Sequence, residues 1–176
     1  MMFNRRQTGD VILTTFDVKT TTDCGTLDAL LDVAVDLTRQ ISTAQRYQSV
    51  LEGLRRVVPC DAAALLRYVD GALVPLAIDG LSPDTMGRRF VPGDHPRLDA
   101  IIASRRPVRF DSEDPRPDPY DGLIDLSAAP DPRVHSCMGC ALYLEDQLVG
   151  ALTADALEAG RFDSVDDGEF AVFAAL

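Results

Sequence analysis

Histidine is scarce in this chain of 176 residues, which contains only His95 and His135. Neither histidine stands in the sequence context of a Ser/His/Asp triad, so that class of nucleophilic catalysis has weak support. The glycine-rich motif GxGxxG and the motif GxxxxGK followed by Ser or Thr, which cradle nucleotide phosphates, do not occur. A metal site in this chain would have to rely on carboxylate or thiolate ligands.

Positive charge is also in deficit, because 17 Lys and Arg face 28 Asp and Glu and leave a net charge of −11. Such a chain repels phosphate backbones, so we expect no direct contact with nucleic acid. The longest apolar runs, such as residues 148–154, have the length of a strand and fall far short of a membrane span. The polar residues 1–8 do not form the apolar core of a signal peptide, so we expect a cytoplasmic protein without membrane contact.

Hydrophobic residues make up 46% of the chain, which is enough for one globular domain with a core of its own. Residues 1–25 show no sustained periodicity and predict a flexible tail, and residues 26–176 form the domain. A first helix is expected from Thr26, with a buried face made of Leu27, Leu30, Leu31, Ala34, Leu37 and Ile41. A second helix begins at the capping box Ser42–Gln45 and ends before Pro59.

The pattern then changes to short apolar runs separated by turns. Residues 62–69 and 72–78 are joined at Asp70-Gly71, which is a strong hairpin signal. Short helices are expected near 96–102 and after a cap within 164–167, and strands at 107–110, 138–144 and 148–154. This order predicts an α+β fold, with an antiparallel sheet flanked by helices on one side. The last helix stops at Leu176 without a stop residue, so we expect it to be truncated and the natural chain to continue into another domain.

Residues 111–134 have neither helical nor strand periodicity and hold five prolines and seven acidic residues. A loop this long inside a compact domain is usually either disordered or functional. We expect this acidic loop to lie over one end of the sheet.

Cys137 and Cys140 have the spacing of a CxxC motif, but they stand at the start of an expected strand. Dithiol chemistry favours such a pair at the N-terminus of a helix, and side chains three apart in a strand point to opposite faces. A zinc knuckle lacks a second pair of ligands. We therefore expect Cys140 to be a core thiol facing away from Cys137, and Cys24 to be peripheral.

Cys137 and Asp155 are each nine residues from Asp146, the expected centre of the last hairpin. They should therefore be neighbours across the two strands, at the rim where the hairpin opens. A thiol and a carboxylate so placed can converge on one metal ion. The alternative is a strand-capping aspartate beside an unrelated buried cysteine.

The acidic loop offers Asp118 and Asp121, presented on a backbone stiffened by proline. We expect both to fold back toward Cys137 and Asp155, because only a cation or an arginine can gather so many acids. Three carboxylates and one thiolate suit Fe(II) better than zinc.

His135 would share the strand face of Cys137. Arg97 is either the counter-charge of this group or part of an exposed salt bridge, and the loop alone could equally be a solvated surface loop.

Six phrases of the chain resemble the N-terminal GAF regulatory domain of the NorR family, which comprises nitric-oxide-responsive, sigma-54-dependent transcriptional activators. The phrases are LLRY (65–68), PLAIDGL (75–81), GRRF (87–90), HPRL (95–98), DPYDGLI (118–124) and GALT (150–153). DPYDGLI, followed by His135-x-Cys137 and then by Asp155, is the most specific part. The resemblance runs from about Leu27 to the chain end.

The resemblance implies a mononuclear non-haem Fe(II) that binds nitric oxide, with Asp118, Asp121, Cys137 and Asp155 as ligands and with Arg97 and His135 in the cofactor site. It also implies a non-enzymatic sensor, a homodimer, and an ATPase domain and a DNA-binding domain elsewhere in the same protein. The family's second site arginine falls on Ala103, with Arg105 nearby.

Two alternatives remain open at this stage. One is a metal-free GAF module that binds a small organic ligand in the same pocket. The other is a GAF-type thiol reductase that uses Cys137 or Cys140.

Overall fold

The computed structural model describes residues 24–38, 42–124 and 133–176 of the chain. The expected tail therefore lies outside the described residues up to position 23. Helix α1 (Cys24–Thr38) begins two residues before Thr26, which we expected to cap it. The side chain of Cys24 is likewise outside the description, so its expected peripheral position stays a prediction.

Five antiparallel strands form one sheet in the order β2-β1-β5-β4-β3. They are β1 (Ala62–Val69), β2 (Ala72–Asp79), β3 (Val108–Phe110), β4 (Ser136–Leu144) and β5 (Gln147–Ala156). The hairpin between β1 and β2 turns at Asp70 and Gly71, both with positive φ (49° and 74°), which matches the twist of the strands it joins. The predicted antiparallel α+β architecture is confirmed.

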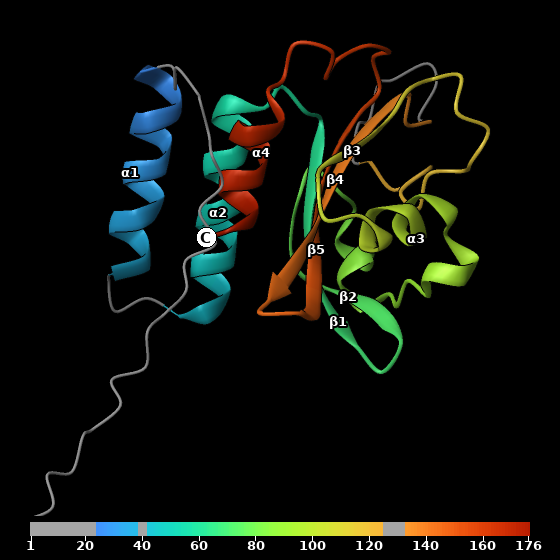
Figure 1. The fold of residues 1–176 in the computed structure, drawn as a ribbon, viewed down its shortest axis with the longest axis horizontal. Coiled ribbons are helices and arrows are strands. Elements are labelled where there is room, and N and C mark those ends of the chain that lie inside the picture. The colour runs from blue at the N-terminus through green and yellow to red at the C-terminus, as the bar shows by residue number, and fades with distance from the viewer. Residues whose placement is uncertain (1–23, 39–41, 125–132) are drawn as a thin grey trace, which may run out of the picture.

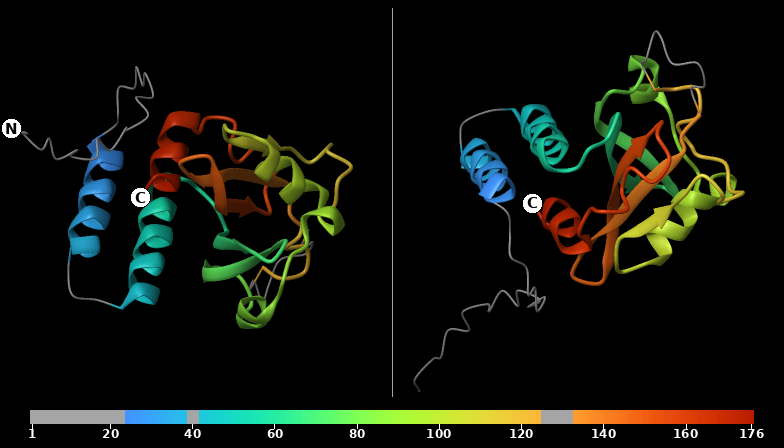
Figure 2. Two further views of the ribbon diagram at one scale, coloured as in Figure 1. Left: turned by 60° about the horizontal axis from the view of Figure 1, so that its bottom comes forward. Right: turned by 90° about the horizontal axis from the view of Figure 1, so that it is seen from above.

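Helices lie on both faces of the sheet, which corrects our expectation of one side. Helices α2 (Thr43–Val57) and α4 (Asp167–Ala174) cover one face, with α1 packed against the outer side of α2, and α3 (Pro96–Ala103) packs on the other face (Figures 1 and 2). The short 3₁₀ helix η2 (Pro92–Asp94) lies beside α3, and the short 3₁₀ helix η1 (Pro83–Gly87) lies beside β2. Among the described residues, the core consists of two hydrophobic clusters, one on each face of the sheet. The sheet is therefore buried on both sides.

The buried face of α1 differs from the prediction. Leu27 and Leu31 are about half exposed, at 51% and 55%, whereas Ala29 and Val33 are buried. Val33 and Ala29 lie directly over Gly53 of α2, where an added Cβ would stand 2.4 Å from Val33 Cγ2. So close an approach of two helices requires small side chains at the contact, and the larger leucines are turned outward.

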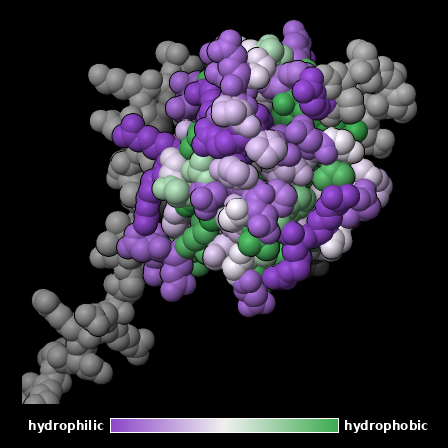
Figure 3. All heavy atoms as spheres, turned by 90° about the vertical axis from the view of Figure 1, so that its right-hand side faces the viewer, coloured by the Kyte–Doolittle hydropathy of each residue, from purple (hydrophilic) through white to green (hydrophobic). Residues whose placement is uncertain are grey.

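Small residues cover the part of the sheet that faces α3. Ala62, Ala64 and Ala151 are fully buried there, and Gly139 leaves the space that Ile101 of α3 fills. These short side chains leave room over the strands for larger side chains from α3 and from the loop after β3. Seen from this side, the surface is mostly hydrophilic, with hydrophobic side chains scattered among the polar ones (Figure 3).

Candidate metal centre

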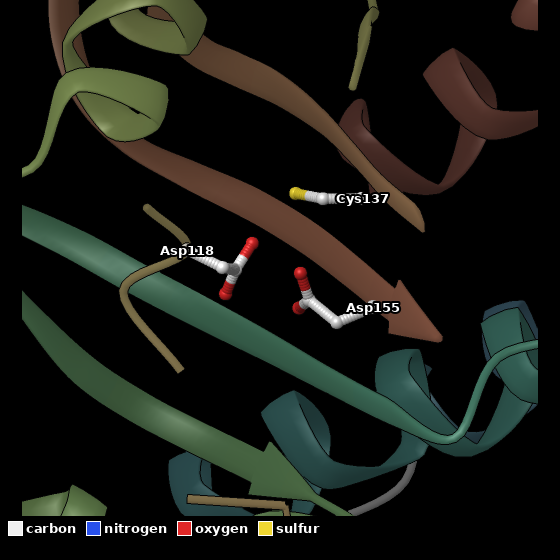
Figure 4. A group of neighbouring side chains, drawn as sticks. All are labelled: Asp118, Cys137 and Asp155. Carbon is white, nitrogen blue, oxygen red and sulfur yellow. The ribbon is translucent and has the colours of Figure 1, made fainter. Parts of the chain in front are cut away.

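Three side chains from distant parts of the sequence meet between the sheet and the loop that covers it. One ligand atom each of Asp118, Cys137 and Asp155 lies within 4.8 Å of the others, and all three residues are buried. Asp118 comes from the loop, Cys137 from β4 and Asp155 from β5, and their side chains point toward one another (Figure 4). The structure thus brings together three of the four predicted ligands.

The strand register places Cys137 beside Asp155, as predicted. The turn itself is Glu145-Asp146, so Leu144 pairs with Gln147 and a simple ladder would not align Cys137 with Asp155. An irregularity between Leu142 and Tyr143 shifts the register by one residue and restores that pairing. The expected rim position is wrong, because Cys137 and Asp155 are only 1% and 0% exposed.

Asp118 is held by Arg97, which extends from the first turn of α3. Arg97 Nη1 donates to Asp118 Oδ2 at 3.0 Å, and Arg97 Nε donates to the carbonyl oxygen of Arg116 at 2.8 Å. The guanidinium also lies 5.4 Å from the ring centre of Phe110. Because Arg97 is 4% exposed, it is a buried counter-charge and not the exposed salt bridge that we considered.

Asp121 and His135 lie outside this three-residue group. Asp121 is exposed, and its Oδ1 accepts a hydrogen bond from the backbone N–H of Val134 at 2.8 Å. His135 is half-buried, and its backbone N–H donates to the carbonyl oxygen of Ala156 at 2.9 Å. The acidic loop is described only to Ile124 and again from Arg133, so its expected course over residues 125–132 lies outside the description.

The two cysteines of the CxxC spacing lie on opposite faces of the sheet, as predicted. Cys140 belongs to the hydrophobic cluster under α1, α2 and α4, and Cys137 to the cluster under α3. Burial raises the pKa of Cys140 to about 11. Neither a shared disulfide nor a shared metal ion is compatible with this arrangement.

The family model of the GAF domain matches residues 42–176, which is most of the chain. The chain belongs to the GAF domain family. It is 45% identical over 150 residues to the anaerobic nitric oxide reductase transcription regulator NorR of Klebsiella pneumoniae, and 44% identical to that of Shigella flexneri. The alignments cover 85% of this chain but only 29% of those relatives.

Solved GAF structures show the same fold at low sequence identity. The GAF domain of a phosphoenolpyruvate-protein phosphotransferase from Coxiella burnetii has a TM-score of 0.63 at 20% identity, covering 86% of this chain and 91% of that one. Free methionine-R-sulfoxide reductase from Neisseria meningitidis has a TM-score of 0.64 at 15% identity, covering 89% of each chain. In the described residues of this GAF domain, no helix is both long and apolar enough to span a membrane.

The buried acidic side chains of this GAF domain have few hydrogen-bond partners and counter-charges. Within the described residues, neither carboxylate oxygen of Asp155 has a hydrogen-bond partner. Burial, and then the charge of Asp118, raise the pKa of Asp155 well above its usual range. Burial also raises the pKa of Asp118 to about 6 despite its ion pair, and holds the pKa of the Cys137 thiol far above normal.

These shifts favour the neutral forms of the Asp155 carboxyl and the Cys137 thiol, and Arg97 balances the charge of Asp118. From that state two protons would leave when a divalent cation enters, and the net charge of the group would stay the same. An unpartnered buried carboxylate beside a thiol is the observation that fits a metal ligand set.

We expect the metal-free domain to lose stability as pH rises, relative to an Asp155→Asn variant. A carboxyl whose pKa is raised by folding imposes no penalty below its unfolded pKa of about 4, and its full penalty above the folded pKa. For Asp155 the penalty begins to grow above about pH 4 and increases up to its raised folded pKa. Asp118, whose pKa is raised to about 6, is present in both proteins. We expect urea unfolding at pH 5 and pH 7.5 to show that the free energy of unfolding of the variant, relative to that of the wild type, is larger at pH 7.5 than at pH 5. Comparing the two proteins cancels His95, whose lowered pKa acts in the opposite direction.

Sequence reasoning missed two hydroxyl groups of the site. Tyr120 is fully buried, and Thr153 Oγ1 donates a hydrogen bond to its phenol oxygen at 3.2 Å. A signal was present for each: Tyr120 lies between the two acids of DPYD, and Thr153 shares a strand face with Asp155 because it is two residues away.

Proposed function

We propose that this GAF domain is the nitric-oxide-sensing domain of a cytoplasmic, sigma-54-dependent transcription regulator. The observation that carries the proposal is the buried group Asp118, Cys137 and Asp155, in which one carboxylate has no partner among the described residues. The names of the 44–45% identical relatives supply the ligand and the regulatory role. Because the chain spans less than a third of those proteins, the attached ATPase and DNA-binding domains are part of the proposal.

The donor set suits a mononuclear non-haem Fe(II). Two carboxylates and one thiolate are anionic, predominantly hard ligands, whereas structural zinc sites are usually closed by cysteine and histidine. When bound, the Fe(II) would supply an open coordination position at which nitric oxide binds.

Asp121 and His135 remain candidates for completing the site. The backbone N–H of Asp121 donates to the carbonyl oxygen of Asp118 at 3.3 Å, so one turn presents both acids. The contact with Val134 uses Oδ1 of Asp121 and leaves Oδ2 as the oxygen that could ligate. His135 lies two residues before Cys137 and close to the group along the chain.

The protein residues prepare the site in three ways. The Asp155 carboxyl and the Cys137 thiol would release their protons if a metal ion bound, and Arg97 keeps Asp118 in place and charge-balanced. Burial keeps bulk water from the ligands, which strengthens every charge interaction there. Since Arg97 lies in the first turn of α3 and also holds the loop at Arg116, a change in the ligands would act on both elements at once.

That coupling offers a route for signal transmission. An effector shifts a conformational equilibrium only through contacts that differ between two states. The contacts of Arg97 with Asp118 and with Arg116 are the ones we assign to that role. Their rearrangement would change how the domain contacts the attached ATPase, and a homodimer would present two such surfaces.

Anaerobic reconstitution tests the proposal. The chain is incubated with excess Fe(II), desalted and analysed for iron, and its EPR spectrum is recorded before and after addition of nitric oxide. We expect about one iron per chain and a half-integer-spin signal that appears only with nitric oxide. A folded protein that takes up no iron would contradict the proposal and favour a GAF module that binds an organic ligand.

The thiol-reductase alternative has a specific fold neighbour in the methionine sulfoxide reductase. It requires an accessible thiolate, whereas burial raises the pKa of both Cys137 and Cys140. Turnover of methionine sulfoxide with a dithiol reductant by the metal-free chain would favour this alternative over the sensor.

A further inference from the structure

Asp118 is the one member of the metal-binding group that does not belong to the sheet. Cys137 and Asp155 are fixed by the ladder between β4 and β5. Asp118 lies on the loop after β3, so its distance from Cys137 and Asp155 depends on the contacts that hold this loop against the strands. Arg97 ties it to α3, which is a separate element.

Tyr120 ties the same loop directly to the sheet. Its backbone N–H donates to Asp118 Oδ1 at 2.8 Å, and its phenol oxygen accepts a hydrogen bond from Thr153 Oγ1 on β5 at 3.2 Å. The ring is fully buried and packs edge-to-face against Phe90, with 5.5 Å between ring centres. One residue therefore holds the Asp118 carboxylate at one end and the strand of Asp155 at the other.

Thr153 is placed for this contact by the register of the sheet. It lies two residues before Asp155 on the same face, and its neighbours across the ladder are Ala64 and Gly139. Both neighbours are small, and the space over Gly139 is filled by Ile101 of α3, whose Cδ1 an added Cβ would meet at 2.3 Å. Tyr120 reaches the Thr153 hydroxyl from the loop after β3.

We propose that the Tyr120–Thr153 hydrogen bond is a positioning contact that sets the distance of Asp118 from Cys137 and Asp155. Neither residue is a ligand in this assignment. The inference rests on the proposed function only where it expects an effect on metal affinity, because the position of the loop can be measured without metal.

The phenol oxygen of Tyr120 is the acceptor in its hydrogen bond with Thr153. Since Thr153 donates to the phenol oxygen, the phenol proton can be donated in turn to another acceptor. Partners of this kind around a metal site orient its ligands, and their loss typically weakens metal binding by about 10- to 100-fold.

The metal-free test uses the reactivity of Cys137, which lies beneath the Tyr120 segment. The full chain is treated with a thiol-alkylating reagent under native conditions, and mass spectrometry follows Cys137 and Cys140 separately. Tyr120→Phe and Thr153→Val should each speed alkylation of Cys137 by about fivefold, the effect of losing one net hydrogen bond. Cys140 reports on general loosening, because it is buried on the opposite face.

Tyr143→Phe is the matched control. Tyr143 also donates its phenol proton inside the protein, to the carbonyl oxygen of Ile102 at 2.8 Å, but this contact joins β4 to α3 away from the metal-binding group. We expect no change in the Cys137 rate. Thr153→Ser should restore most of what Thr153→Val loses, and the double variant Tyr120→Phe/Thr153→Val should be no worse than either single one.

Fe(II) titration of the same variants provides the second readout. Affinity should fall by about 10-fold or more in Tyr120→Phe and Thr153→Val, and stay unchanged in Tyr143→Phe. If no protein in the set binds iron, the proposed function fails while the alkylation rates still decide the positioning role. Equal Cys137 rates in Tyr120→Phe and Tyr143→Phe, or a parallel rise at Cys140, would overturn the inference.

Discussion

Cys137→Ala is expected to abolish Fe(II) binding and the EPR signal obtained with nitric oxide, whereas Cys140→Ala leaves both intact. The two residues are buried thiols on the same strand, three positions apart. They differ in the face they occupy, since only Cys137 lies beside Asp118 and Asp155. Removing a ligand should cost more than the 10- to 100-fold typical of a supporting residue, so we expect a loss of more than about 100-fold.

The stability of these two variants should be similar. Each substitution removes one buried sulfur atom, which costs about 1–2 kcal/mol through lost contacts and a small cavity. Urea unfolding at one pH checks that both metal-free proteins remain folded. A full-intensity signal in Cys137→Ala would show that the thiolate is no part of the sensor.

Arg97→Met should be the most destabilising single substitution in the site, by about 3–5 kcal/mol at pH 7.5. It leaves Asp118 buried without its counter-charge and removes the hydrogen bond to the carbonyl oxygen of Arg116. The loss should shrink at pH 5, because protonation of Asp118 removes the uncompensated charge. Chemical unfolding at both pH values measures the effect, and Arg97→Lys gives a second variant should Arg97→Met fail to fold.

Arg105→Met is the matched control for this prediction. Arg105 also combines an ion pair, with Asp146, and an aromatic contact, with Tyr143. Its pair is exposed, with side-chain exposures of 60% and 94%, so we expect a loss of no more than about 1 kcal/mol. Equal losses in Arg97→Met and Arg105→Met would mean that Asp118 needs no buried counter-charge.

The pairing of Cys137 with Asp155 could be predicted because it depends on local chain geometry. Apolar runs on either side of a polar turn define a hairpin, and alternation then assigns the faces. The prediction placed the centre at Asp146 and succeeded because the irregularity at Leu142/Tyr143 compensates for the two-residue turn. The sequence contains no clear signal for that irregularity, so the agreement depended on it.

The return of Asp118 toward Cys137 and Asp155 was predicted, but the nearly complete burial of the site was not, because it depends on contacts between distant parts of the chain. The open end of a hairpin is exposed unless another segment covers it, and the cover here is the Asp118–Tyr120 turn, held from α3 and from β5. These contacts join residues about 20 and 33 positions apart. The predicted buried face of α1 was wrong for a related reason. The tight contact at Gly53 of α2 decides which face of α1 is buried, and the periodicity within α1 carries no information about that glycine.

X-ray absorption at the iron edge of the anaerobically reconstituted chain tests the central claim most directly. That claim is that Asp118, Cys137 and Asp155 hold one iron through two carboxylates and one thiolate. We predict a spectrum with one sulfur neighbour and otherwise oxygen or nitrogen neighbours. A spectrum that contains no sulfur neighbour, from a wild-type protein that holds one iron, would contradict the account.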